Sequence, residues 1–492
     1  MENPFEFSLL LNIFVALSFI SFVTFLIWIF RRQDYFKNHN IPYINSFPLL
    51  GSYTDSLFGR TSFYYNVLGI CNRAEVKEKL FFGIFLFHNP CLMIKEPEII
   101  KRILVKDFQS FNNRYTNSDV HDVLGYYELF ILKNPLWKKM RGKLSPFFTS
   151  GRLKSMFYIL DKISNDLVDF IHKRLDDDEK VELEIKHLTA LYSTDVIASC
   201  VYGIDAKSLE NPKGEFREIG RLMFEPTFWR ILEYTSVFLL PQITKLFGFK
   251  AFTEKGDKFI RETVTQAMIE REKNIDILMA QAAVFFLAGY ETSSTTNAFA
   301  MYEIAKSKEI QDRLRNEIRE VLVKNDGKVT YDSIMNATEI PYLNQIINET
   351  LRLYPILPIL DRVCTKSDGY SLEPFSDFKI PCGMPIHIPV YAIHLDEKNF
   401  PEPLKFDPER FSQDNIQNIK PFTFFPFGHG PRNCIGERFG LMQVKTAIVK
   451  VLKDFRLEPS PRTPMEIVIE KKAFLIQSDK ELLVDLIKDP LY

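Results

Sequence analysis

A ten-residue stretch around Cys434, Phe427-Gly-His-Gly-Pro-Arg-Asn-Cys-Ile-Gly436, places the strongest constraint on how this chain can fold. Gly430 and Gly436 permit a tight turn and a close approach of the backbone to a flat ligand. The apolar run from Phe439 to Leu452 predicts a helix just after the cysteine, and a helix N-terminus stabilises a thiolate. The stretch therefore predicts a loop that holds one thiolate beneath a large cofactor. The alternative for a lone cysteine in such a turn is a buried structural residue.

The same stretch resembles the haem-binding signature of the cytochrome P450 monooxygenases, and in particular the insect detoxification branch. The matching positions are Phe427, Gly430, Arg432, Cys434 and Gly436. The resemblance implies haem b (iron protoporphyrin IX) with Cys434 as its axial iron ligand. In this family the thiolate favours O–O cleavage.

Charge and cysteine usage narrow the class of protein further. The 492 residues include 62 basic and 63 acidic side chains, so a net charge of −1 gives no field that would attract nucleic acid. The cysteines lack paired spacing, which disfavours a disulfide framework, and the eight histidines have no zinc-ligand spacing. The six cysteines are Cys71, Cys91, Cys200, Cys364, Cys382 and Cys434.

The N-terminus predicts a membrane anchor over residues 1–30. Ser8 to Phe30 is apolar, carries no charge and is long enough to cross a bilayer, and Arg31-Arg32 follows at once. The positive-inside rule then places the body on the cytoplasmic side. A cleaved signal peptide is the alternative, but the run is too long and lacks a basic start.

The rest of the chain is expected to divide into two parts. Pro42, Pro48 and Gly51 predict a stiff hinge over residues 31–52. Residues 53–492 are predicted to form one haem-thiolate catalytic domain. By resemblance, the fold is mainly α with small β-sheets (α+β), the cytochrome P450 fold with one N-terminal transmembrane helix.

Several other segments have a predicted structure. Phe81 to Phe87 and Cys91 to Ile94 read as strands, and Pro97 to Val105 as a helix. Ser193 to Asp205 resembles a long helix and the following turn of the animal microsomal members. The aromatic stretch from Met223 to Phe252 either packs internally or dips into the membrane as a substrate roof.

Basic residues are predicted to clamp the cofactor edge. Trp137 and Arg141 lie four residues apart, on one helix face, and the forked donors of arginine suit carboxylates. The resemblance implies that Arg114, Trp137 and Arg141 hold the haem propionates, with Arg362 as a further ligand. Alone, a Trp/Arg pair is more often surface packing.

The segment from Ile277 to Ser307 predicts one long buried helix with a functional centre. Ala288 and Thr292 share a face, and Gly289 leaves a groove beside them. Thr292 can bond the carbonyl four residues back, and with Glu291 it can relay protons to bound dioxygen. The alternative is a kinked core helix with small packing residues.

One charged motif and two apolar segments have further expected roles. Glu349 and Arg352 match the family's Glu-x-x-Arg pattern, and with Arg410 they are predicted to form a buried structural network. Leu357, Ile359 and Leu360 are expected to face substrate. The resemblance adds a last substrate-contacting turn at Ala473, Phe474 and Leu475, and a further propionate contact at His394.

The resemblance implies a membrane-bound monooxygenase of the endoplasmic reticulum. It would insert one atom of O2 into lipophilic substrates such as insecticides, plant toxins, hormones or lipids. Its partners would be NADPH-cytochrome P450 reductase, with cytochrome b5 as an optional second donor, and the chain lacks a nucleotide fingerprint of its own. The exposed face expected to receive the reductase carries Lys138, Lys139 and Lys143.

The resemblance has one departure, since Arg271-Glu-Lys-Asn274 leads directly into the long helix. Family members normally have a further helix and loop at this point. Two alternative functions stay open. One is a haem-thiolate isomerase or dehydratase that works without reductase, and the other, because of this departure, is a non-catalytic haem binder.

Overall fold

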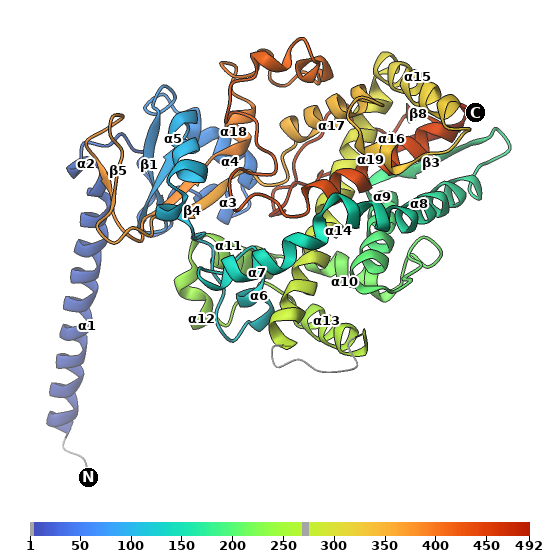
Figure 1. The fold of residues 1–492 in the computed structure, drawn as a ribbon. Helices are drawn as coiled ribbons and strands as arrows, with labels where there is room; N and C mark the ends of the chain where they lie inside the picture. Colours follow the sequence, from blue (N-terminus) through green and yellow to red (C-terminus); the bar gives the residue numbers. More distant parts are fainter. Residues whose placement is uncertain (1–3, 268–274) are drawn as a thin grey trace.

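The computed structural model describes residues 4–267 and 275–492, so the junction at Arg271–Asn274 lies outside the described residues. Helices surround a central helix, and small sheets lie on the flanks (Figure 1). The α-helices are α1 (Pro4–Gln33), α2 (Tyr35–Asn38), α3 (Thr54–Leu57), α4 (Phe63–Cys71), α5 (Pro97–Lys101), α6 (Val123–Tyr127), α7 (Leu136–Leu144), α8 (Ser150–His172), α9 (Ile185–Ile197), α10 (Glu215–Phe224), α11 (Phe228–Leu239), α12 (Thr244–Phe247), α13 (Glu254–Ala267), α14 (Ile275–Lys306), α15 (Lys308–Lys324), α16 (Tyr331–Met335), α17 (Pro341–Leu353), α18 (Val390–His394) and α19 (Glu437–Asp454).

Short turns of other helix types connect these elements. The π-helices are η1 (Arg102–Lys106) and η4 (Ala198–Tyr202). The 3-10 helices are η2 (Phe108–Phe111), η3 (Ser145–Phe148), η5 (Pro241–Ile243), η6 (Pro408–Phe411) and η7 (Ile416–Asn418). The helix expected over Pro97–Val105 is thus α5 followed by η1. The segment expected after Ser193 continues α9 into η4, and Gly203 then turns the chain with φ +69°.

Three small sheets complete the fold. The strands are β1 (Phe81–Leu86), β2 (Asn89–Ile94), β3 (Lys180–Glu184), β4 (Leu360–Val363), β5 (Tyr370–Ser371), β6 (Lys379–Ile380), β7 (Pro385–Ile388), β8 (Phe455–Pro459) and β9 (Leu483–Lys488). One sheet has the order β1-β2-β7-β4, in which only the β2–β7 pair is parallel. The other two are the antiparallel sheets β3-β9-β8 and β5-β6. This mixture agrees with the predicted α+β class.

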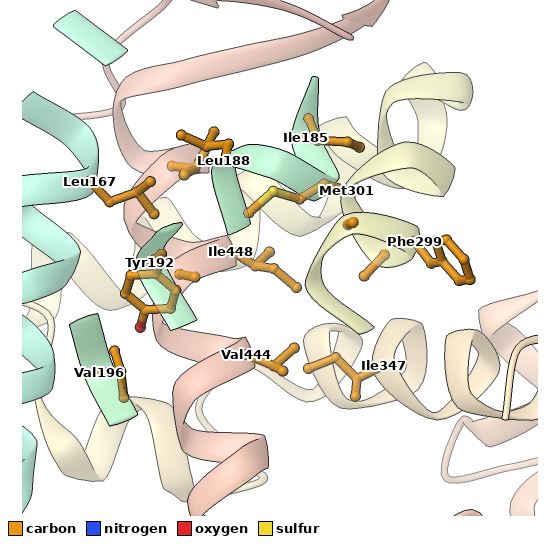
Figure 2. Packing of buried hydrophobic residues seen from close by; sticks show 14 of the residues in the cluster. Leu167, Ile185, Leu188, Tyr192, Val196, Phe299, Met301, Ile347, Val444 and Ile448 are labelled. Carbon is orange, nitrogen blue, oxygen red and sulfur yellow. The ribbon is translucent and has the colours of Figure 1, made fainter. Parts of the chain in front are cut away.

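The main core packs α8, α9, α17 and α19 around α14 (Figure 2). Buried side chains cover much of the surface of α14, from Ala280 to Ala305, as expected for a helix that is enclosed on several sides. Tyr192 of α9 shows how the polar groups of this core are satisfied, because its hydroxyl donates to the Gln443 carbonyl at 3.2 Å. Because α14 lies at the centre of this core, its backbone is held in place relative to α19 and to the cysteine loop that precedes α19.

The N-terminal helix α1 extends away from the body (Figure 1). Among the residues that the structure describes, none of the helices combines the length and apolar character needed to cross a membrane. The segment predicted as a hinge contacts the first sheet, because Gly83 N donates to the Pro42 carbonyl at 2.8 Å and Ile44 N donates to the Gly83 carbonyl at 3.0 Å.

Candidate active site

The cysteine loop turns tightly just before α19. Cys434 N donates to the Phe427 carbonyl at 2.8 Å, and Asn433 N donates to the Gly430 carbonyl at 3.0 Å. Gly430 has φ +74°, and a Cβ at this position would overlap the carbonyl oxygen of Leu104. A side chain is therefore excluded here by both backbone conformation and space.

Protein groups push the proton affinity of the Cys434 thiol in opposite directions. The side chain opens onto a cavity, yet the atoms packed around it desolvate the sulfur and raise the pKa of Cys434. The backbone N–H of Gly436 and the charge of Arg141 lower it. Because burial dominates, the predicted stabilisation by the helix N-terminus does not by itself bring the pKa below its usual value. A coordinated metal ion supplies the missing positive charge and deprotonates a thiol.

The thiol faces a cavity of about 600 Å³ that separates the cysteine loop from α14. Phe427, Cys434 and Gly436 line one wall. Ala288 and Thr292, with Gly289 between them on the same helix, line the opposite wall. The sequence prediction that these two distant motifs face one ligand is therefore consistent with their placement.

The central turn of α14 has the predicted threonine contact. Thr292 Oγ1 donates to the Ala288 carbonyl at 2.5 Å. Gly289 has a packing role as well, because a Cβ there would overlap Ile197 at the end of α9. The groove predicted beside Gly289 is therefore filled by Ile197, while Ala288 and Thr292 line the cavity.

Arginines gather at one edge of the cavity. Arg432 lies with its guanidinium carbon 4.2 Å from the centroid of the Trp137 indole, and Arg114 and Arg362 are also in the lining. Burial, together with the charges of Arg114 and Arg362, lowers the pKa of Arg432 to about 8. Burial and Arg114 likewise lower the pKa of Arg362 to about 9. Arg362 Nε has no hydrogen-bond partner among the described residues.

Asp361 is a charged residue of this edge that the sequence reasoning missed. Its Oδ1 accepts from Arg114 at 2.8 Å, and its Oδ2 accepts from the backbone and side chain of Thr116 at 2.9 Å each. Burial alone would raise the pKa of Asp361, but Arg114 and the Thr116 N–H hold it well below its usual range. In the sequence, only its position next to Arg362 could have pointed to Asp361. The single negative charge of Asp361 does not balance the positive charges of the clustered arginines.

Arg141 lines the cavity and also holds the cysteine loop. Its two terminal nitrogens donate to the carbonyl and the side-chain oxygen of Asn433, at 2.8 and 2.9 Å. Asn433 directly precedes Cys434, so Arg141 fixes the loop that carries the thiol.

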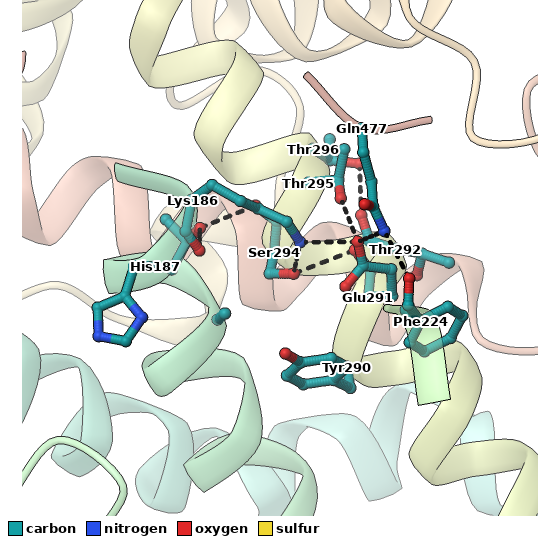
Figure 3. A network of polar contacts seen from close by, with 12 residues as sticks. Lys186, His187, Phe224, Tyr290, Glu291, Thr292, Ser294, Thr295, Thr296 and Gln477 are labelled. Atoms are coloured by element: carbon teal, nitrogen blue, oxygen red, sulfur yellow. Dashed lines mark hydrogen bonds and ion pairs between the residues drawn. The ribbon is translucent and has the colours of Figure 1, made fainter. Parts of the chain in front are cut away.

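Glu291 lies outside the cavity lining, although it is adjacent to Thr292 (Figure 3). Its Oε1 forms an ion pair with Lys186 of α9 at 3.1 Å and accepts from Thr295 at 3.4 Å. Gln477 Nε2 also donates to this oxygen, at 3.2 Å. The structure thus places the predicted relay acid on the flank of α14, inside a polar network.

The structure brings together the three residues predicted to form a charged network. Arg352 donates to both oxygens of Glu349 at 2.7 Å, and Arg410 Nε lies 3.4 Å from Glu349 Oε1. Arg352 and Glu349 are fully buried. Asp407 N adds a further hydrogen bond to Glu349, at 2.9 Å.

The remaining predicted residues are placed unequally. Leu357 and Leu360 line the large cavity, whereas Ile359 does not appear in its lining. Ala473 and Phe474 line a separate, smaller cavity of about 50 Å³. His394 lies in neither lining; it is fully buried and its Nε2 accepts from Phe425 N at 3.2 Å.

The donor set fits haem. A thiol on one wall, a threonine-bearing helix on the other and a partly unbalanced cationic edge suit an iron-bearing macrocycle with two carboxylates. The unpartnered Arg362 Nε would gain an acceptor from such a carboxylate. Fold and site together define a haem-thiolate protein.

The comparisons with known proteins agree with this class. The family model for cytochrome P450 matches residues 64–484, so the chain belongs to the cytochrome P450 family. It is similar to probable cytochrome P450 6g2 of Drosophila melanogaster, at 40% identity over 94% of this chain and 96% of the relative. It is also similar to cytochrome P450 6k1 of Blattella germanica, at 34% identity over 93% of each. Cytochrome P450 9e2 of Blattella germanica is 36% identical over 94% of this chain and 95% of that protein. Family membership implies a haem cofactor and a monooxygenase activity.

Proposed function

We propose that this protein is a membrane-bound monooxygenase that inserts one atom of O2 into lipophilic substrates. The other atom leaves as water, with two electrons from NADPH and two protons consumed per turnover. The observation that carries the proposal is that Cys434 and Thr292 line opposite walls of one cavity whose edge is cationic.

Cys434 would be the axial ligand, between Phe427 and Gly436. Arg114, Trp137, Arg362 and Arg432 would hold the propionate edge, and Arg141 would support the loop through Asn433. When bound, the haem iron supplies the activation of dioxygen, and its thiolate ligand favours O–O cleavage.

Residues of α14 would deliver the protons. Thr292 lines the cavity, and its hydroxyl would pass a proton toward the reacting oxygen. The small side chain of Ala288 in the lining would leave space for that oxygen and for a water molecule. Glu291, on the flank of the same helix, would supply the proton to Thr292 from the α9 side.

The substrate class is proposed from the chemistry of the cavity wall. Apolar side chains such as Val284, Ile356, Leu357 and Leu360 line the cavity, while the charged residues of the lining are Arg114, Arg362 and Arg432 at the propionate edge and Arg141 beside Asn433. Uncharged lipophiles suit this wall. The family 6 resemblance favours foreign compounds such as insecticides and plant toxins, with hormones and lipids as further candidates.

Partners and location follow from the resemblance and from surface features. Lys138, Lys139 and Lys143 are exposed on α7 and would receive the acidic NADPH-cytochrome P450 reductase, with cytochrome b5 as an optional donor. The uncharged sequence from Ser8 to Phe30 supports an anchor in the endoplasmic reticulum membrane. The exposed Phe228 and Trp229 of α11 and Leu246 and Phe247 of α12 support a roof that meets the bilayer.

Reconstitution tests the proposed function. The haem-loaded protein, reductase and NADPH are incubated with a panel of neutral lipophiles, and hydroxylated product is measured by mass spectrometry. Product labelled with one atom from 18O2 supports the proposal. Product formed without reductase would indicate an isomerase or dehydratase, and haem binding without any product would indicate a non-catalytic haem binder.

A further inference from the structure

Gln477 connects the C-terminal turn that carries it to the helices α14 and α10. Its side-chain NH2 donates to Glu291 Oε1 at 3.2 Å and to the Phe224 carbonyl at 3.4 Å. Glu291 belongs to α14, and Phe224 is the last residue of α10 (Figure 3). A primary amide nitrogen carries two hydrogens, so these contacts use its full donor capacity.

The turn that carries Gln477 also carries a bulky ring beneath α11. The centroid of the Phe474 ring lies 4.2 Å from that of Phe238 and 5.2 Å from that of Tyr234, both in α11. Phe238 in turn lies 6.0 Å from Phe130, which lines the large cavity. Phe474 itself lines the small cavity, so this ring cluster stands between the two cavities. Phe474 lies three residues before Gln477 in the same turn.

The other donors to Glu291 come from the opposite side. Lys186 Nζ contacts Glu291 Oε1 at 3.1 Å and donates to Ser294 Oγ at 2.6 Å. Thr295 Oγ1 donates to the same carboxylate oxygen at 3.4 Å. Lys186, Ser294 and Thr295 belong to α9 and α14, which pack closely, so Gln477 is the donor to Glu291 that comes from the same turn as Phe474.

We infer that Gln477 is a positioning residue that links displacement of Phe474 to release of Glu291 for proton delivery. While Phe474 stays packed against Phe238 and Tyr234, Gln477 holds the Glu291 carboxylate on the flank of α14. When Phe474 moves, the amide withdraws and Glu291 can carry a proton from solvent to the Thr292 hydroxyl, which passes its own proton toward the reacting oxygen. This inference rests on the proposed function for its chemical consequence, but not for the mechanical link.

The consequence is tested by Gln477→Leu, which keeps the size of the side chain and removes both donors. In the reconstituted enzyme without substrate, we expect NADPH consumption to rise about fivefold, which corresponds to one hydrogen bond of average net strength. The solvent deuterium isotope effect on that rate should fall, since Glu291 is no longer restrained. The matched control is Gln417→Leu, which makes the same substitution at an exposed glutamine in η7. Unchanged or slower NADPH consumption in Gln477→Leu at wild-type haem content would overturn the inference.

The mechanical link is tested without turnover, by hydrogen exchange of the peptide 286–297. We expect Phe474→Ala to speed exchange in this peptide when Gln477 is present, and to have little further effect in the Phe474→Ala/Gln477→Leu double variant. Such non-additivity measures coupling between the two positions. Additive effects would show that the ring and α14 are not linked through the amide. A wild-type protein without NADPH consumption would defeat the proposed function, and the exchange cycle would still decide the link.

Discussion

Removal of Arg352 tests whether the buried charge network supports the fold. In Arg352→Leu, Glu349 loses two hydrogen bonds of 2.7 Å and keeps the Asp407 N–H at 2.9 Å and Arg410 at 3.4 Å. The substitution also removes the donor to the Pro403 carbonyl. Stranding one charge of a fully buried pair costs about 3–5 kcal/mol. A typical domain has a total stability of about 5–15 kcal/mol, so this loss is about a fifth of it or more.

Urea unfolding, followed by tryptophan fluorescence, measures the effect together with haem content. We expect a large fall in the unfolding midpoint of Arg352→Leu and little haem-loaded protein. The double variant Arg352→Leu/Glu349→Leu should lose less than the sum of the single variants, because the Glu349 charge is removed together with its main partner and only Arg410, which keeps the Glu402 carbonyl, loses its carboxylate. Lys154→Ala, which breaks an exposed ion pair with Asp332, is the control and should leave the midpoint unchanged. A wild-type midpoint and haem content in Arg352→Leu would refute the reasoning.

Three further predictions follow from the site and the core. Gly430→Ala should abolish haem incorporation, because φ +74° and a backbone carbonyl leave no space for a Cβ, whereas Gly142→Ala, in open space, should keep full haem content by absorbance. Thr292→Val should keep the haem spectrum but lower product formation roughly 100-fold or more, with NADPH diverted to peroxide; normal product yield would exclude the relay. Burial lowers the pKa of His387 to about 4 and of His394 to about 3, so the neutral rings favour folding above the unfolded pKa near 6.5. The free energy of unfolding should therefore fall as the pH drops from about 6.5 toward 4, with a slope set by the uptake of up to two protons on unfolding. His387→Gln should reduce this uptake by one proton. A urea midpoint that does not change over this range would contradict the assignment.

Motifs that act through neighbouring residues could be predicted from the sequence. The Ala288–Thr292 turn and the Glu349–Arg352 pair are local patterns for which helix periodicity is enough to place the side chains on one face, and the loop around Cys434 was assigned by its resemblance to a family signature. The same reasoning placed α14 and α19 within two residues of their observed starts.

Contacts between distant segments could not be predicted in this way. Lys186 and Glu291 belong to different helices, and the Gln477 amide reaches α14 from the C-terminal turn. The sequence therefore named Glu291 as a relay acid but could not indicate its position on the flank of the helix. Asp361 escaped notice for the same reason, since its partner Arg114 lies 247 residues away.

The central claim is that Cys434 ligates haem iron as a thiolate. The most direct test is the difference spectrum of the full chain after reduction and addition of carbon monoxide. We predict a strongly red-shifted Soret band for the wild-type protein and for Cys382→Ser, whose exposed cysteine lies outside the cavity lining. Cys434→Ser should lose this band. A wild-type band at the position of neutral ligation, or a red-shifted band that survives in Cys434→Ser, would contradict the claim.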